Sequence, residues 1–574
     1  MKLPWKVRIL IGPMRPFLLL KVRDAIRERI LRSRLRSLLP VNTADGVSLR
    51  AGITPLPSES WFAQHSADVL GFAERMREGS VDAYSVEHWR VGQDEPANVD
   101  VRSVHELSRM HHWCAYALAS HIDADRRDMW CQLLYEEIET FMRTSPAEIG
   151  VHWEFPMGTA LRLHSMLVAW DWARRSGWSD IQADNCMMEY AADHAANVVA
   201  RRESRGGLST SHYAANLLGI LAAGCYIDGH QSAVSWQDLA TRELQKELIR
   251  QILPDGMANE ASTGYHRQVT DIFVQASSLM TFTPEHRQRI LKAVECCRLI
   301  EHIGMPLIGD NDDGLAMKLS GFAPDLSYLY DVAARTCGPI DTKSTNSILP
   351  DFGLTIRQHA GFIITLRNGP VGQFGKGGHA HNDQNSITVS VGGSPLIVDP
   401  GTSCYTSDCK QRNRERSVSS HATMWSTIAE QCSSPHGEEG LFWMLQDETR
   451  LRMIANTNLE WHGIVEHASG RSHSRRITFV PNGIECHDEY RHPAARGEHV
   501  EVVFPLAMSV EVALNHDTAI LRSSTATVKL IWSAGDMSIE PITAAPTFGR
   551  TELSQCLRLR TKSVHWTLVL LTNP

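Results

Sequence analysis

The hydrophobic pattern of this chain changes character once, near residue 340, and that change constrains the fold more than any other feature. From about Trp61 to Thr336 the apolar residues recur at helical spacing in strings rich in Ala and Leu, such as residues 217–223. From about Ile348 onward the apolar runs are short, rich in Val, Ile, Thr and Phe, and separated by Gly, Pro, Asn and Asp. We therefore predict a multidomain α+β chain, in which an N-terminal helical array or toroid precedes a C-terminal antiparallel β-sandwich.

Three regions follow from this pattern. Residues 1–45 form a basic amphipathic segment, residues 46–340 the helical domain, and residues 341–574 the β-sandwich domain. The boundary between the two large domains is expected within residues 336–347, which contain a Gly-Pro pair. At 574 residues the chain is long enough for two domains with cores of their own.

The charge of the chain argues against one class of partner and suggests another. The formal net charge is −8 and the sequence pI is about 6.4, so nothing in the composition indicates binding to nucleic acid. Residues 1–38, in contrast, hold eleven Lys and Arg against two acidic residues, with apolar residues at helical spacing. Such a helix favours peripheral contact with an anionic membrane surface, or else packs as a solvated basic helix on the acidic body of the protein.

The same segment bears on where the protein acts. Its apolar runs are too short and too interrupted to span a bilayer, and Gly12, Pro13 and Arg15 break any signal-peptide core. We expect a cytoplasmic or membrane-peripheral protein, with the periplasm as the alternative. The 12 cysteines are scattered and form no Cys-x-x-Cys pair, which predicts reduced or buried thiols and no disulfide framework.

The residues that carry most chemistry lie in 378–383, which read Gly-His-Ala-His-Asn-Asp. At strand spacing, His379 and His381 point to one face and can share one site. The hairpin that follows carries Asp399 back toward this pair, and His421 comes soon after. Imidazole and carboxylate are the ligands that zinc takes in the absence of thiolates, so the set predicts a divalent metal site that favours zinc. Among 27 histidines, however, a close pair at the surface or in the core also arises by chance.

The segment from Gly361 to Met424 resembles the heparinase II/III-like polysaccharide lyases, a family that includes alginate and oligoalginate lyases. It contains the family's Gly-His-x-His-x-Asp stretch, Val-Asp-Pro-Gly turn and Ser/Ala-His element in that order. Residues 105–109 and 150–162 are similar to two helical elements of the family, so the resemblance covers roughly residues 60–510. It implies an N-terminal α/α toroid, an antiparallel β-sandwich and an active site in the cleft between them.

Lyases of this kind cut a uronic-acid polysaccharide by β-elimination, which needs three functions. A base removes the proton at C5, an acid protonates the leaving oxygen at C4, and a third group neutralises the uronate carboxylate. Residues 211–217 resemble the family's Asn-His-x-x-x-Asn helix start, and residues 260–266 resemble its Glu-x-x-x-x-Tyr-His motif. Both motifs fall in the predicted helical domain, so the implied site draws on both domains.

The resemblance implies a role for each residue. Tyr265 is the general acid and also the base for one C5 epimer, whereas His212 is the base for the other epimer or helps to hold the carboxylate. His379 neutralises the carboxylate or orients Tyr265. The metal, a zinc ion that fixes the loop of His379 and is mainly structural, is held by His381, Asp399 and His421. The implied substrate-binding residues are Ser211, Asn216, His152, Glu106, Arg162, Glu260 and His266.

Two departures from the family pattern bear on the substrate. Ser211 stands where the family has the Asn that binds the uronate carboxylate, and His152 stands in another Asn position. Serine offers one hydroxyl donor where Asn offers an amide, so either other groups hold the carboxylate or the acidic group sits elsewhere. Glu106 and Arg162 also have a structural alternative, as charge partners between helices.

Two other functions stay open on the sequence. A metal-dependent glycan hydrolase would use the metal site itself, with metal-activated water as the nucleophile. A non-catalytic polysaccharide-binding or assembly factor of exopolysaccharide or lipopolysaccharide metabolism would fit the basic N-terminus and the departure at Ser211. The combined presence of Tyr265, His212 and His379 favours the lyase, because a binding protein needs neither an acid nor a base.

Overall fold

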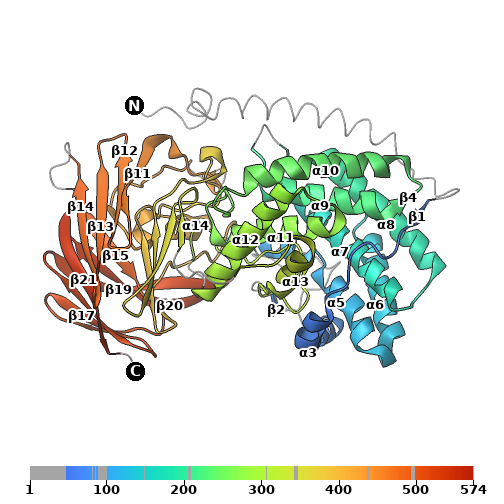
Figure 1. The fold of residues 1–574 in the computed structure, drawn as a ribbon, viewed down its shortest axis with the longest axis horizontal. Helices are drawn as coiled ribbons and strands as arrows, with labels where there is room; N and C mark the ends of the chain where they lie inside the picture. The colour runs from blue at the N-terminus through green and yellow to red at the C-terminus, as the bar shows by residue number, and fades with distance from the viewer. Residues whose placement is uncertain are drawn as a thin grey trace.

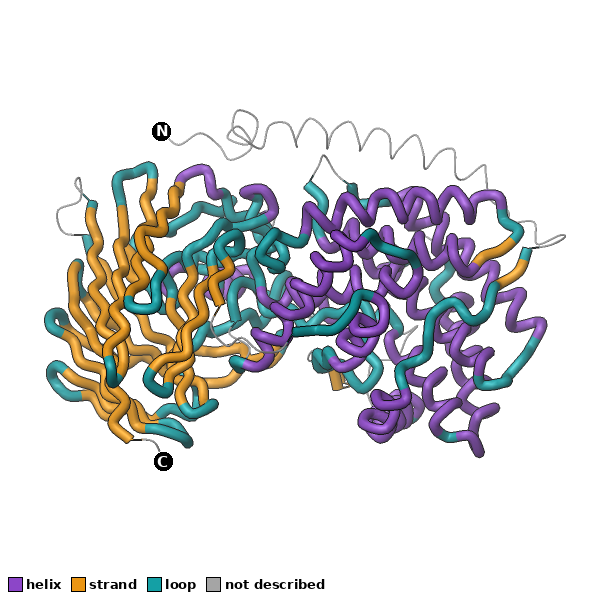
Figure 2. The backbone as a smooth tube through the Cα atoms, in the orientation of Figure 1, coloured by secondary structure: helices purple, strands orange, loops and turns teal. Residues whose placement is uncertain are grey.

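The computed structural model consists of helices in the first part of the chain and strands in the second (Figure 1). It describes residues 47–79, 82–83, 86–87, 100–147, 149–204, 208–304, 307–341, 347–435, 440–492 and 498–572. The basic segment 1–38 therefore lies outside the described residues. The helical half and the strand half lie side by side along the long axis of the molecule (Figure 2).

Two helices that are apolar on all sides form the inside of the helical domain. α7 (Pro156–Arg175) and α9 (Ser211–Tyr226) are buried along nearly their whole length and pack against each other. Their backbones come close at Gly219, where a Cβ atom would lie 2.7 Å from the carbonyl oxygen of Ala160. The surrounding helices are α3 (Glu59–Arg77), α4 (Val101–Leu107), α5 (His111–Ile122), α6 (Arg127–Thr144), α8 (Ile181–Arg201), α10 (Gln231–Gln251), α11 (Thr263–Leu279), α12 (Pro284–His302) and α13 (Ser327–Thr336).

Three antiparallel sheets make up the described part of the C-terminal domain, together with the short helix α14 (Cys409–Glu415). The five-stranded sheet has the order β5 (Ser347–Leu349), β6 (Leu354–His359), β7 (Phe362–Arg367), β8 (Ile387–Val391) and β9 (Ser394–Ile397). The eight-stranded sheet has the order β11 (Thr449–Asn456), β12 (Glu460–His467), β13 (Ser472–Val480), β14 (Gly483–Arg491), β21 (Ser563–Thr572), β18 (Thr527–Trp532), β17 (Thr518–Arg522) and β16 (Glu511–Leu514). The four-stranded sheet has the order β10 (Met424–Ser426), β15 (Val500–Pro505), β20 (Arg550–Arg560) and β19 (Asp536–Thr547).

One hydrophobic core joins these three sheets. Alternate residues of the strands point into it, as Ile387, Val389 and Val391 do on β8. Phe504 of the four-stranded sheet packs edge-on against Trp566 of the eight-stranded sheet, with ring centroids 5.3 Å apart. The helical half, followed by these layered sheets, confirms the predicted class, an α/α toroid followed by an antiparallel β-sandwich.

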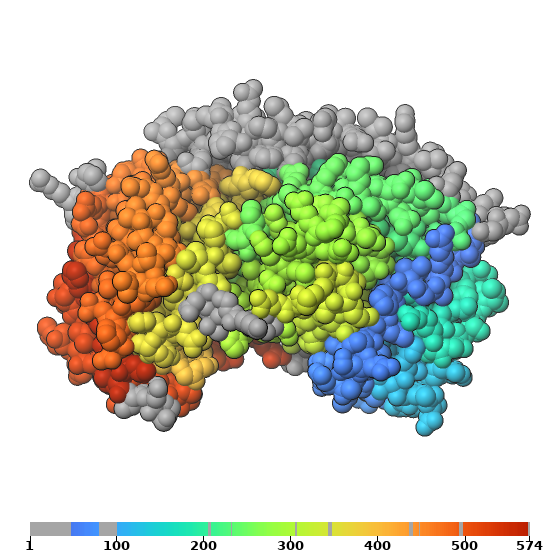
Figure 3. Space-filling view, in the orientation of Figure 1, coloured from blue at the N-terminus to red at the C-terminus, as the bar shows by residue number. Residues whose placement is uncertain are grey.

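An irregular, buried segment of the helical half contacts both halves. Residues 308–319 form no helix or strand, yet all of them are buried. Gly309 sits here with φ 64°, and a Cβ atom would lie 2.5 Å from the carbonyl oxygens of Ala261 and His379. Backbone from both domains therefore closes on this segment. In the space-filling view, the green and yellow middle of the chain forms the junction between the two halves (Figure 3).

The ends of the helices and strands can be compared with the predicted domain junction, and the helices can be assessed for membrane-spanning length. α13 ends at Thr336 and β5 begins at Ser347, on either side of the predicted junction. Among the helices that the structure describes, none has both the length and the apolar character needed to cross a bilayer.

Candidate active site

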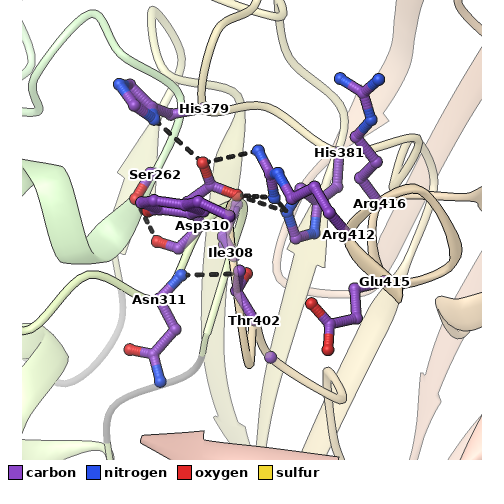
Figure 4. Close-up of polar contacts among 12 residues, drawn as sticks. Ser262, Ile308, Asp310, Asn311, His379, His381, Thr402, Arg412, Glu415 and Arg416 are labelled. Atoms are coloured by element: carbon purple, nitrogen blue, oxygen red, sulfur yellow. Dashed lines mark hydrogen bonds and ion pairs between the residues drawn. The ribbon is translucent and has the colours of Figure 1, made fainter. Parts of the chain in front are cut away.

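The two histidines of the Gly-His-Ala-His stretch meet a buried carboxylate of the helical half (Figure 4). They lie in the loop between β7 and β8, so the strand expected from their spacing is replaced by a loop. The Nδ1–H of His379 donates to Oδ2 of Asp310, and the Nε2–H of His381 donates to Oδ1, each at 2.9 Å. The shared carboxylate, and not strand geometry, therefore brings the two imidazoles together.

The guanidinium of Arg412 also contacts the Asp310 carboxylate. Nη2 of Arg412, on α14, donates to Oδ2 at 2.8 Å, and Nη1 bonds to Oδ1. Burial by itself raises the pKa of Asp310, but Arg412 and the two imidazoles outweigh burial and hold that pKa well below its usual value. Ser262 also donates its hydroxyl to the carbonyl oxygen of Asp310 at 2.6 Å. Asp310 is thus a fixed anion at neutral pH.

Tyr265, the expected general acid, lies directly against His379. Their ring centroids are 3.5 Å apart and the ring planes differ by 18°. Tyr265 is in the first turn of α11, where the hydroxyl of Ser262 caps the helix and accepts the Tyr265 N–H at 3.1 Å. Tyr405 of the β domain points its hydroxyl at the Tyr265 hydroxyl, at 3.5 Å. Burial and nearby carboxylates hold the pKa of Tyr265 well above its usual value, so this phenol keeps its proton.

Glu260 connects this cluster to the start of α9. Its Oε1 accepts the backbone N–H of Ser211 at 2.6 Å, and its Oε2 lies 3.5 Å from Nε2 of His379. Ser211 is fully buried, and its hydroxyl has no hydrogen-bond partner among the described residues. Ser211 therefore offers no exposed donor at the position where the family has its carboxylate-binding Asn.

His212 follows on the same helix but reaches solvent, with 36% of its side chain exposed. Its Nδ1 bonds to Oε1 of Glu203 at 2.9 Å. Asn216 lies one turn later and holds the same glutamate. Its Nδ2 donates to Oε2 of Glu203 at 3.3 Å, and its Oδ1 accepts the Glu203 N–H at 2.8 Å. Asn216 is fully buried and so faces Glu203 instead of solvent.

The three expected metal ligands lie together in the β domain. Ligand atoms of His381, Asp399 and His421 all lie within 4.8 Å of one another. Nδ1 of His381 and Nε2 of His421 are buried and have no hydrogen-bond partner among the described residues. The other nitrogens are occupied, since Nε2 of His381 bonds to Asp310 and Nδ1 of His421 to Asp399 at 2.8 Å. Two unpartnered imidazole nitrogens beside a carboxylate fit a divalent cation such as zinc.

Four of the expected substrate-binding residues lie inside the helical domain with protein partners. Glu106 is fully buried among cations and pairs with Arg102 at 2.9 Å, with Lys318 at 2.8 Å and also with Arg109. This is the structural alternative considered for Glu106, and its contact with substrate remains a prediction.

Arg162, His152 and His266 are likewise internal. Arg162 donates through Nη1 to the carbonyl oxygen of His152 at 3.1 Å, and through Nε to a neighbouring imidazole. Burial and the charge of Arg162 lower the pKa of His152 to about 4, so His152 is neutral at pH 7. Both ring nitrogens of His266 bond to backbone, at Ala258 and at Ala293. The polar contacts described above for these residues lie within the helical domain, and their contact with substrate remains a prediction.

Four residues of the site carried no clear signal in the sequence. Asp310 lies in an Asp- and Asn-rich run that reads as a polar loop, and Glu203 lies just after a helix. Arg412 is one of two arginines of a short polar helix, and Tyr405 lies in an irregular stretch. Their contacts in the folded structure single them out, and for Asp310, Arg412 and Tyr405 these contacts join segments distant in sequence.

Comparison with known proteins agrees with this architecture. Residues 89–290 match the family described as heparinase II/III N-terminus, and residues 342–566 match the one described as heparinase II/III-like, C-terminal. Among solved structures, a heparinase III has a TM-score of 0.66 and 14% identity, covering 98% of this chain and 93% of that one. The heparan sulfate lyase HepC from Pedobacter heparinus has a TM-score of 0.55 and 12% identity, covering 99% and 92%. No curated protein sequence matches the chain.

The two family matches include the segments that carry the site described above. The N-terminal match contains Tyr265 and His212, and the C-terminal match contains His379 and the three candidate metal ligands. At these identities the solved structures show a common fold, which spans nearly the whole of both chains. The chain therefore belongs to the heparinase II/III-like family of polysaccharide lyases.

Proposed function

We propose that this chain cleaves an anionic, uronate-containing polysaccharide by β-elimination. The observation that supports this most is the stacking of Tyr265 on His379 at 3.5 Å. It pairs a protonated phenol from the helical domain with an imidazole from the β domain, and Asp310 fixes that imidazole. A purely binding surface has no use for a buried proton donor held in this way.

The proposed reaction moves two protons. His212 takes the C5 proton through Nε2, and the electron pair of the C–H bond forms a double bond between C4 and C5. The bond from C4 to the glycosidic oxygen breaks, and Tyr265 gives its phenolic proton to that oxygen. Tyr265 then regains a proton from solvent and His212 releases one. For the other C5 epimer, Tyr265 would serve as base and acid in turn, after first losing the proton that burial makes it retain.

The uronate carboxylate needs a partner, because C5 is a weak acid next to a free carboxylate anion. We assign this role to His379, whose Nδ1–H is held by Asp310. The role requires a second proton on Nε2, which is directed toward Glu260 and would donate to the uronate carboxylate. Ser211 does not contribute in this proposal, since its hydroxyl is buried. The carboxylate would thus be met by the β domain and the proton donor by the helical domain.

We further propose that zinc binds His381, Asp399 and His421 and has a structural role. A bound divalent cation would neutralise the Asp399 carboxylate and cross-link two loops of the β domain. Through its Nε2, His381 then orients Asp310, which in turn orients His379. The hydrolase alternative rests on one observation, that Asp399 also lines a cavity of about 430 Å³ between the domains, through which water could reach a metal.

The test is ultraviolet absorbance of the unsaturated uronate that β-elimination leaves at the new chain end. The purified protein is incubated with alginate, heparan-type and bacterial exopolysaccharides, with Tyr265→Phe as the comparison. A rise in absorbance that is absent with Tyr265→Phe supports the lyase. New reducing ends without that absorbance, lost on metal removal, would indicate a hydrolase. Binding of a polymer without any cleavage would indicate an assembly factor.

A further inference from the structure

We propose that Glu203 is a positioning residue that holds His212 with its Nε2 toward the substrate, and that Asn216 acts by fixing Glu203. This inference rests on the proposed function, because it concerns the base of the elimination. It gives Asn216 a task other than binding the substrate, and it adds a residue that lies outside the motifs of the sequence.

Glu203 is held by two side chains of α9. His212 and Asn216 are four residues apart on α9, so their side chains share one face of the helix. Glu203 follows α8 and lies against this face. One carboxylate oxygen takes the Nδ1–H of His212 at 2.9 Å, while the other oxygen and the backbone N–H are held by Asn216 at 3.3 Å and 2.8 Å. Glu203 cannot rotate away without breaking the Asn216 contacts.

A fixed carboxylate on Nδ1 decides the tautomer of neutral His212. With the proton on Nδ1, the lone pair is on Nε2, which is the only ring nitrogen left to accept a proton. The side chain is 36% exposed, whereas that of Glu203 is 16% exposed, so the open side of the imidazole faces solvent and the carboxylate lies behind it. This is the arrangement in which a carboxylate orients a histidine base.

The charges around His212 also favour its role as a base. Partial burial lowers the pKa of His212, and the positive end of α9 also opposes a second proton, but Glu203 outweighs burial and the net shift is upward. Glu260 before α11 adds to the rise, while Lys376 of the β domain opposes it. His105 of α4 is also within electrostatic range of His212, and burial together with nearby arginines lowers the pKa of His105 to about 3, which leaves it uncharged. Glu203 is therefore the main source of the basicity of His212.

The first test is Glu203→Gln, compared on a polymer that the wild-type protein cleaves. The glutamine amide can donate to Nδ1 and so favour the proton on Nε2, which removes the lone pair from the substrate side. We expect kcat to fall about 10²- to 10³-fold with KM changed less than about threefold, and the acidic limb of the kcat/KM profile to move to lower pH. An unchanged limb would overturn the proposal, because a purely structural role lowers activity without moving it.

A matched control is another histidine–glutamate pair of the helical domain. His112 bonds to Glu137 at 2.8 Å through Nε2, and Glu137 also accepts the hydroxyl of Tyr116. Glu137→Gln is expected to leave the pH profile in place. Glu203→Asp keeps the charge but shortens the side chain, and is expected to recover at least about tenfold of the kcat lost in Glu203→Gln. No recovery with the aspartate would contradict a role that depends on charge.

A second measurement needs no substrate and so separates this proposal from the proposed function. Nitrogen-15 NMR of labelled histidines reports tautomer and pKa, with the His212 signal assigned from its loss in His212→Gln. We expect neutral His212 to carry its proton on Nδ1, and its pKa to fall in Glu203→Gln. A proton on Nε2 in the wild-type protein, or equal pKa values in both proteins, would overturn the role of Glu203 even if the lyase activity is real. The expected NMR result without activity on any polymer would count against the lyase and leave the Glu203 contact intact.

Discussion

The imidazole of His379 lies flat against the phenol ring of Tyr265, although the two residues belong to different domains. The contact depends on Asp310, whose buried segment binds both the β domain and the cap of α11. Since neither domain contains the pair alone, the site exists only where the two domains pack together.

Removing the Tyr265 hydroxyl tests its role as the acid. Tyr265→Phe keeps the ring that stacks on His379, so we expect a melting temperature within about 3 °C of wild type. We expect kcat to fall about 10²- to 10⁴-fold, which is the usual contribution of a positioned acid or base. Tyr328→Phe, in a buried tyrosine of α13, is the control and should leave kcat unchanged. Full activity in Tyr265→Phe would remove the phenol from the mechanism.

Asp310 should support both stability and activity. Asp310→Asn leaves Arg412 buried without its counter-charge, so we expect the free energy of unfolding to fall by about 3–5 kcal/mol. Arg412→Met combined with Asp310→Asn should recover much of that loss, because the unpaired charge is gone. Activity should stay low in the double variant, since His379 has lost its anion. Thermal unfolding and initial rates check this, and equal melting temperatures for Asp310→Asn and wild type would contradict it.

The metal prediction concerns stoichiometry. Elemental analysis should find about one divalent metal per chain in the wild-type protein and none in His421→Gln. The control is His473→Gln, because His473 is also a fully buried histidine bonded to an aspartate, Asp488, at 2.9 Å, but is not part of the ligand cluster. Metal retained by His421→Gln would show that the three ligands do not form the site. A chelator should lower the melting temperature of the wild-type protein and leave that of His421→Gln unchanged.

The surroundings of Glu498 predict how the stability of the folded protein depends on pH. Burial raises its pKa, but hydrogen bonds from Ser426, His492 and Arg471 outweigh burial and lower that pKa from 4.5 to about 2. A lowered carboxylate pKa stabilises the folded state above about pH 4.5, and this stabilisation is lost as the pH falls toward 2. Glu498→Gln should therefore lower the free energy of unfolding by about 1–2 kcal/mol at neutral pH, since solvent screens part of the interaction, and by progressively less in acid. Glu466→Gln, at an exposed ion pair, should cost less than about 0.5 kcal/mol at any pH.

Ser211 tests the departure from the family pattern. Its hydroxyl is buried and unpartnered among the described residues, so Ser211→Ala should be neutral or stabilise by up to about 1 kcal/mol. We also expect kcat/KM to stay within about threefold of wild type. A tenfold rise in KM would show instead that the hydroxyl reaches the substrate.

Much of the architecture was predictable because it depends on neighbours along the chain. Helical spacing over residues 61–336 and short β-branched runs after residue 348 predicted both domains and their order. The hairpin after the histidines was also predictable, and β8 and β9 form it. It returns Asp399 so that its carboxylate lies within 4.8 Å of a ring nitrogen of His381, as the metal prediction requires.

The sequence by itself therefore determined the two domains, the family motifs and the set of candidate metal ligands, all of which depend on local spacing and residue type. Only the tertiary structure decided which buried charges meet. Asp310 bonds to Arg412 and to two histidines across a domain interface, and Glu203 bonds to His212 and Asn216 of the next helix. It also turned Ser211 inward and surrounded Glu106 with cations. The pairings of Asp310 join segments far apart in sequence, and that of Glu203 joins two neighbouring helices. No local pattern encodes either kind, because burial and charge compensation arise only when helices and domains pack.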